Sequence, residues 1–412
     1  MGKDSLKVLM IGFLFLSFLI PPPAFAQEKE PIEIGFISHF SGPFAQNGKD
    51  NLDGAKLYLG KSGYKISGRS VEILAEDEEA SPSTALTKAK KLVELNKVNF
   101  LVGPVMASAG YAVAPYAESK RTPDIIFSAS DDLTQRKRGK YIFRAGMASC
   151  QPAHIMGEYA YNVLGYRNIV AVGMDYAFGW ETVGAFQRAF ESLGGKVIQK
   201  IWTPVNTTDF SPYLPQIRKD ADAVHALMAG NLSFLFIKQF LEYGLKDRLS
   251  LNGVGQLTDE AVLPAMGDGA VGVITALPYS PMIDTPINRE FVKTYREKFG
   301  KTPSLYSELG YTAMSIIDQA VLSLKGNIAD PEKVAESLRS VYLKEAPRGP
   351  IKFDAYGNPV QNIYIRKVER VGGELQNTVI YTYPEVSQFW TFKPQEFLKQ
   401  PVYSRDYPPL KP

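Results

Sequence analysis

Short apolar runs alternate with helical stretches along this chain, and that alternation limits its possible folds more than any other feature. The clearest unit is residues 99–130, NFLVGPVMASAGYAVAPYAESKRTPDIIFSAS. The run 100–102 has the length and composition of a buried parallel strand, and 124–127 reads as another. The Ala-rich segment between them, 106–119, predicts a helix that Pro115 should kink or interrupt. A strand–helix–strand unit of this kind is typical of α/β proteins.

The same order recurs on both sides of this unit. Strands are expected at 32–38 and 71–75, and a second set of alternating strands and helices runs from about 141 to 254. Helices and a hairpin around Gly372-Gly373 follow. A length of 412 residues suggests two or three domains. The sequence therefore predicts two doubly wound parallel-sheet lobes.

Small polar residues follow the strands of the 99–130 unit, where ligands bind in open α/β sheets. Ala107 and Ser108 lie at the expected start of a helix, whose free N–H groups and dipole attract anions. Ser128 and Ser130 add hydroxyl groups after the next strand. We interpret this region as a binding site for a small carboxylate. Ordinary helix capping and turn chemistry is the alternative, and the residues alone leave it open.

Residues 1–26 have the pattern of a cleavable signal peptide. Lys3 and Lys7 precede an uncharged stretch at 8–20, and Ala24-Phe25-Ala26 fits the small-x-small cleavage site. No later segment is apolar and long enough to span a membrane. We therefore expect a soluble protein exported to the periplasm, beginning near Gln27.

Several kinds of chemistry lack their usual residues. Cys150 is the only cysteine, which excludes an intrachain disulfide and a cysteine-based metal site. His39, His154 and His225 have no partner at metal-ligand spacing, so no metal and no cofactor are expected. No G-x-S-x-G motif is present, and we expect no enzyme activity. The net charge of +3 is scattered, with no basic stripe for nucleic acid.

Several stretches, in order and spacing, resemble the type I periplasmic solute-binding proteins of ABC importers, and most of all the leucine/isoleucine/valine-binding group. These stretches are SGPFAQNGKDNLDGA, FLVGPVMASAG, DIIFSASDDLT, MDYAFGWE, TDFSPYLPQI, LEYGL and RGPIKFDAYGNP. The resemblance implies two lobes joined by three crossovers, near Arg144, 277–280 and 350–353, that close on a ligand. Lobe 1 would be 31–145 plus 280–348, and lobe 2 would be 146–279 plus 349–392. The Pro-rich tail 393–412 should lie on the surface or be loosely ordered.

The resemblance also implies the ligand-binding residues. Ala107, Ser108, Ser128 and Ser130 match the positions that hold a carboxylate. Positions around the pocket match Phe44, Asn47, Tyr176, Phe178, Tyr306 and, after later strands of lobe 2, Gly230 and Gln256.

One departure concerns the ligand's ammonium group. Amino-acid binders of this group hold it with an acid in lobe 2, but here the matching position falls near Gly255 or Gln256. Asp175, Asp259 and Glu260 are the alternatives. The hypothesis is thus a binding protein that delivers a small carboxylate to ABC permease subunits. The solute would be a branched-chain or hydrophobic amino acid or an organic acid, and we favour an aromatic or hydrophobic acid.

A sensor domain of the same fold is the alternative function, and an exported enzyme is less favoured. We expect a monomer.

Overall fold

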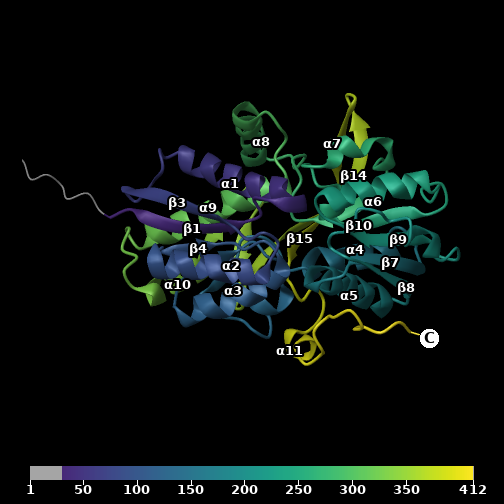
Figure 1. Cartoon of the computed structure of the whole chain (residues 1–412), viewed down its shortest axis with the longest axis horizontal. Coiled ribbons are helices and arrows are strands. Elements are labelled where there is room, and N and C mark those ends of the chain that lie inside the picture. The colour runs from purple at the N-terminus through teal and green to yellow at the C-terminus, as the bar shows by residue number, and fades with distance from the viewer. Residues whose placement is uncertain (1–29, 412) are drawn as a thin grey trace, which may run out of the picture.

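The computed structural model describes residues 30–411, which form two lobes side by side (Figure 1). The first lobe contains a six-stranded sheet in the order β2-β3-β1-β4-β5-β6, parallel except for the β2–β3 pair. Its strands are β1 (Ile32–Ser38), β2 (Lys65–Ile66), β3 (Arg69–Asp77), β4 (Phe100–Val102), β5 (Asp124–Ile126) and β6 (Ile142–Arg144). Phe100 and Val102 pack into one core and Leu101 into another, so both faces of this sheet are buried.

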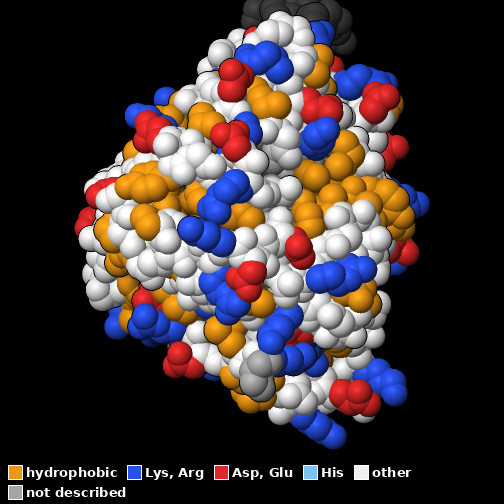
Figure 2. Space-filling model, turned by 90° about the vertical axis from the view of Figure 1, so that its right-hand side faces the viewer, with side chains coloured by type: hydrophobic (Ala, Val, Ile, Leu, Met, Phe, Trp, Pro, Cys, Tyr) orange, Lys and Arg blue, Asp and Glu red, His pale blue; other side chains and the backbone are white. Residues whose placement is uncertain are grey.

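The second lobe contains a nine-stranded sheet. Strands β7 to β11 pair in parallel, whereas β12 to β15 add an antiparallel extension next to β11. Its strands are β7 (Asn168–Met174), β8 (Lys196–Thr203), β9 (Ala223–Leu227), β10 (Ser250–Val254), β11 (Ile274–Leu277), β12 (Tyr342–Leu343), β13 (Ile351–Phe353), β14 (Pro359–Val371) and β15 (Glu374–Val386). On the outer end of this lobe, basic and acidic side chains are interspersed (Figure 2).

Helices cover the faces of both sheets. They are α1 (Ala45–Gly60), α2 (Pro82–Lys90), α3 (Ala107–Ser119), α4 (Cys150–Asn162), α5 (Ala177–Ser192), α6 (Asn231–Glu242), α7 (Leu263–Met266), α8 (Pro286–Phe299), α9 (Leu305–Ser323), α10 (Pro331–Arg339) and α11 (Pro394–Phe397). Three of them begin with proline directly after a capping side chain, namely Ser81, Thr285 and Asp330. These starts are encoded locally, because proline at the first position sacrifices no helical hydrogen bond.

Pro115 was predicted to kink or interrupt its helix, and it does not interrupt it, since α3 continues to Ser119. Pro115 is exposed, so water can reach the carbonyl group that the missing N–H leaves unpaired. Within the second set of alternating strands and helices, segment 210–219 forms only the 3-10 turn η4 (Leu214–Gln216). Pro212 and Pro215 lie in this segment, and neither has an N–H group to donate.

The chain passes between the lobes three times: from β6 to α4, from β11 to α8, and from α10 to β12. A fully buried arginine holds each passage. Arg144 at the end of β6 donates to the carbonyl oxygen of Ser130 at 2.7 Å. Arg366 of β14 donates to that of Tyr279 just after β11, at 3.0 Å.

The third arginine, Arg348, lies between α10 and β13 and forms a 2.7 Å ion pair with Glu308 of α9. It also donates to the carbonyl oxygen of Ala145, just after β6. Arg348 therefore connects the third crossover to the first, while Arg144 and Arg366 attach the first and second crossovers to neighbouring segments. The architecture is the predicted one of two α/β lobes joined by three segments, while the residue boundaries of the lobes remain a prediction.

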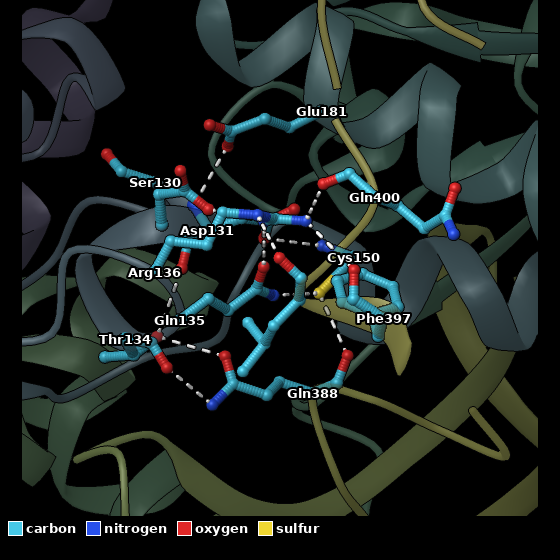
Figure 3. Close-up of polar contacts among 12 residues, drawn as sticks. Ser130, Asp131, Thr134, Gln135, Arg136, Cys150, Glu181, Gln388, Phe397 and Gln400 are labelled. Carbon is cyan, nitrogen blue, oxygen red and sulfur yellow. Dashed lines mark hydrogen bonds and ion pairs between the residues drawn. The ribbon is translucent and has the colours of Figure 1, made fainter. Parts of the chain in front are cut away.

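The Pro-rich segment 393–411 is more firmly packed than the sequence indicates. Phe397 is 1% exposed and Tyr403 is 7% exposed, and both belong to the core formed by α4, α5 and the sheet of the second lobe. Arg136 of the first lobe donates to the carbonyl oxygens of Phe397 and Gln400 (Figure 3). The segment therefore lies on the surface, one of the two predicted possibilities, and its two buried aromatic residues hold it in place.

The predicted signal peptide, 1–26, lies outside the described residues. Within 30–411, no helix combines the length and the apolar composition needed to cross a membrane.

Candidate functional site

A cavity lies between the two lobes, at the carboxyl ends of parallel strands from both sheets. It has an empty volume of about 630 Å³, including the space at its mouth. Its lining comprises His39, Phe44, Asn47, Val105, Met106, Ala107, Phe127, Ala129, Gly146, Met147, Tyr176, Phe178, Ala229, Gln256, Leu305, Tyr306 and Leu309.

Four helices begin at this cavity. The first turns of α1, α3, α5 and α9 contribute Asn47, Ala107, Phe178 and Tyr306, respectively. No side chain caps the N-termini of α1, α3 or α5, whereas Ser304 caps α9. The first N–H groups of a helix have no acceptor within it, and its N-terminus carries partial positive charge. The cavity is therefore suited to an anion.

Charged side chains are absent from the lining, which contains no Asp, Glu, Lys or Arg among the described residues. Its polar side chains are His39, Asn47, Tyr176, Gln256 and Tyr306. Burial is the main cause that raises the pKa of both tyrosines, so their hydroxyl groups stay protonated. The Oε1 atom of Gln256 is buried without a hydrogen-bond partner. The remaining wall is mostly apolar and fits a hydrophobic ligand body.

Glu78 does not line the cavity but binds the loop that forms part of its wall. Its carboxyl group accepts hydrogen bonds from the N–H groups of Val105 at 3.0 Å and Met106 at 3.4 Å, in the loop that leads into α3. Burial is the main cause that raises its pKa to about 8 and lowers that of His39 to about 4. The Nδ1 atom of His39 lies 3.4 Å from Oε1 of Glu78. Because both shifts disfavour charge, we do not treat this contact as a salt bridge.

Seven of the twelve predicted site residues line the cavity together: Phe44, Asn47, Ala107, Tyr176, Phe178, Gln256 and Tyr306. They come from loops and helix starts that are distant in sequence. Their convergence follows from the fold, because the carboxyl ends of parallel strands meet at one edge of each sheet.

The three predicted serines do not line the cavity. Ser130 Oγ donates to the carbonyl oxygen of Ala107 at 2.8 Å and to Ser128 Oγ at 3.3 Å. Ser108 Oγ is buried without a partner. Between Ser128 and Ser130, Ala129 reaches the cavity instead. Neighbouring residues in an extended segment point to opposite sides. The methyl group of Ala129 therefore faces the cavity, and the hydroxyl groups of Ser128 and Ser130 do not.

Asp175 and Gly230 also lie off the cavity wall. Asp175 accepts from Trp180 Nε1 at 2.9 Å and pairs with Arg405 of the tail at 3.6 Å. Gly230 precedes α6 and contacts the loop around Phe44 in the first lobe.

The other acids considered for an ammonium group are engaged elsewhere. Asp259 accepts from the N–H groups of Ala261 at 3.1 Å and Leu305 at 3.3 Å. Glu260 accepts from Arg366 at 3.3 Å and Asn377 at 2.7 Å. Neither lines the cavity. No group of three or more potential metal ligands occurs among residues 30–411.

Sequence reasoning missed several wall residues, including His39, Met106, Phe127, Ala129 and Met147. His39 and Phe127 directly follow strands β1 and β5, and Ala129 is the third residue after β5, so position after a strand was the available signal. Leu309 on the second turn of α9 had no such signal, because its place depends on how α9 packs against the sheet.

The model of the periplasmic binding protein family matches residues 31–374. A "Leu/Ile/Val-binding protein homolog 6" from Brucella abortus is 31% identical over 368 residues, which cover 87% of this chain and 93% of that protein.

Two solved structures are similar over nearly their whole length. A solute-binding protein of an ABC transporter from Rhodopseudomonas palustris BisB5, in complex with 3,4-dihydroxybenzoic acid, is 32% identical with a TM-score of 0.83. The alignment covers 87% of this chain and 98% of that one. Another from R. palustris, in complex with benzoate, is 28% identical with a TM-score of 0.82, and the alignment covers 87% and 97%.

Proposed function

The chain belongs to the periplasmic binding protein family, and from this premise we propose that its interlobe cavity binds an aromatic carboxylate. The protein is a substrate-binding protein of an ABC transporter, not an enzyme. The choice of ligand class is the proposal. It rests on one observation above all: the cavity is surrounded by helix N-termini but lined by no acidic side chain.

The carboxylate end of such a ligand fits the first lobe. We infer that it lies at the start of α3, where the N–H groups of Ala107 and Ser108 are not capped by a side chain. Hydrogen bonds to a charged group contribute about 1.5–3 kcal/mol each, which compensates for the absent cationic side chain. Ser128 and Ser130 would then act indirectly, by fixing the carbonyl of Ala107.

The ring of the ligand fits the aromatic and apolar wall. Phe44 and Phe127 belong to the first lobe, and Tyr176 and Phe178 belong to the second. A ring placed between them contacts both lobes, so it binds the closed arrangement better than an open one and shifts the population toward it. The bound benzoate and dihydroxybenzoate of the two R. palustris proteins support this ligand class.

An amino acid is the second candidate, because relatives are named Leu/Ile/Val-binding proteins. A zwitterion, however, would place its ammonium group in a cavity without a carboxylate. Burying an ammonium without an ionic partner costs several kcal/mol. We therefore rank amino acids below aromatic acids. Export to the periplasm and delivery to permease subunits complete the proposed function.

Calorimetric titration tests the ligand class with matched pairs. Benzoate and 4-hydroxybenzoate are compared with leucine and phenylalanine, and 3-phenylpropionate serves as phenylalanine without its amino group. We expect the acids without an amino group to bind at least tenfold more tightly. Tighter binding of leucine or phenylalanine would overturn the assignment to aromatic acids, and failure of both classes would overturn the carboxylate site.

A further inference from the structure

A hydrogen bond crosses from one lobe to the other next to the cavity. Tyr111 Oη on α3 of the first lobe donates to Oε1 of Glu181 on α5 of the second lobe, at 2.5 Å. The other carboxyl oxygen, Oε2, accepts from the N–H group of Asp131 in the first lobe at 3.1 Å. Figure 3 shows Glu181 directed toward Asp131. Glu181 thus contacts two separate segments of the first lobe.

Both ends of this bond are well fixed. Tyr111 Oη also accepts from the N–H group of Asp132 at 3.1 Å. Oε2 of Glu181 also accepts from Ser149 Oγ, just after the first crossover, at 2.9 Å. Glu181 is almost fully buried, and a buried carboxyl group that loses its partners is costly. The bond is therefore part of a complete network only while the lobes are together.

The two helices that carry this bond are among the four whose first turns reach the ligand cavity. Ala107 lies one turn before Tyr111 on α3, and Phe178 lies three residues before Glu181 on α5. Residues three or four apart on a helix lie on the same face. A rotation that moves α5 away from α3 would therefore open the cavity and break this bond together.

We propose that the Tyr111–Glu181 hydrogen bond is a latch between the lobes, formed as they close and therefore adding to ligand affinity. The inference deepens the proposed function and rests on it, because it assumes a ligand that binds the closed lobes. Neither side chain lines the cavity, so the latch would act on affinity without touching the ligand.

The chain offers a matched control. Tyr58 Oη on α1 donates to Asp318 on α9 at 2.7 Å, and both belong to the first lobe. Tyr58→Phe and Tyr111→Phe each remove one hydroxyl group from a partly buried tyrosine–carboxylate pair. The first change affects one lobe only, whereas the second affects the junction between lobes.

The experiment measures benzoate affinity and melting temperature for wild type, Tyr111→Phe, Glu181→Gln, the double variant and Tyr58→Phe. We expect Tyr111→Phe to weaken benzoate binding about five- to tenfold, the range for one lost hydrogen bond. Tyr58→Phe should lower the melting temperature similarly and leave affinity within about twofold. The double variant should lose less affinity than the two single losses combined, because both substitutions weaken the same hydrogen-bond network: an amide at position 181 can accept on one side only, whereas the carboxyl group accepts on both.

Equal affinities of Tyr111→Phe and Tyr58→Phe would overturn the latch, even if both variants are destabilised. If no aromatic acid or amino acid binds the wild type, the proposed function fails. The latch is then tested by small-angle scattering of the ligand-free proteins. A larger radius of gyration for Tyr111→Phe than for wild type and Tyr58→Phe would support it, and equal radii would overturn it.

Discussion

Gly230 lies against Phe44 across the cleft, so closely that a methyl group at Gly230 would come within 2.8 Å of the ring atom Cδ1. The same methyl group would lie 2.9 Å from the carbonyl oxygen of Pro43. Gly230 belongs to the second lobe and Phe44 to the first. The cleft therefore closes over a position where only glycine fits.

Gly230→Ala should weaken ligand binding about tenfold, a loss of about 1.4 kcal/mol, because the lobes can no longer approach fully. Gly230 also has a positive φ of 57°, which by itself strains alanine. Gly267→Ala is the control, since Gly267 has a φ of 58° and open space around it. Titration of both variants with benzoate checks the prediction, and equal losses would assign the effect to backbone strain alone.

Gln256→Glu should shift the ligand preference from benzoate toward amino acids. It would place a carboxyl group on a cavity wall that has none, near the position where the family resemblance locates the missing acid. A carboxylate there repels benzoate and pairs with an ammonium group. The affinity for benzoate should therefore fall, and that for leucine or phenylalanine should rise, each by at least about tenfold. Gln256→Met keeps the volume without charge. If Gln256→Glu behaves like Gln256→Met, charge at this wall does not select the ligand.

Thermal stability should fall as the pH rises from 6.5 to 8. Burial raises the pKa values of Glu78, Glu181 and Asp259 to about 8, with the Asp131 carboxylate adding to the shift at Glu181 and the Glu260 carboxylate adding to that at Asp259. The folded protein then holds protons that the unfolded chain has released, so the free energy of unfolding decreases with pH in this range.

The buried histidines act in a different range. Burial lowers the pKa values of His39 and His225 to about 4 and that of His154 to about 3, so their contribution is lost only as the pH falls below about 6.5.

Five other titratable groups face Glu181: Tyr111, Asp131, Arg144, Cys150 and Tyr176. Burial raises the pKa values of the two tyrosines and of Cys150, so these groups stay neutral from pH 6.5 to 8, and Arg144 stays charged. Apart from Glu181, only Asp131 titrates near this range, because burial raises its pKa to about 6. Glu181→Gln removes one of the titrating acids. Its melting temperature should therefore depend less on pH than that of wild type. A wild-type melting temperature that rises between pH 6.5 and 8 would contradict the assignment of these acids as protonated.

Phe397→Ala should destabilise the protein by about 3–5 kcal/mol, the usual cost of removing a buried aromatic ring. Phe397 is 1% exposed and packs against Phe389 and Tyr403. Leu410→Ala, at a residue 43% exposed, should change stability by less than about 0.5 kcal/mol. Urea unfolding measures both variants. A small effect at Phe397 would mean that the tail adds little to folding.

The site illustrates where sequence reasoning succeeds and where it stops. Phe178 and Tyr306 were predicted from the family resemblance, and both line the cavity because they begin helices at positions that a doubly wound sheet directs toward one cleft. At 128–130 the same reasoning chose the hydroxyl groups, whereas the structure turns Ala129 to the cavity. The choice between neighbours in an extended segment depends on its orientation, which composition does not encode.

The sequence by itself determined the α/β class, the two lobes and several residues at strand ends that line one cavity, because periodicity and turn residues act over a few neighbours along the chain. Only the tertiary structure decided that three arginines hold the crossovers, that Phe397 and Tyr403 bury the tail, and that Tyr111 meets Glu181. Those two residues are 70 positions apart. Contacts of this kind depend on which distant surfaces pack together, and that is a property of the whole folded chain.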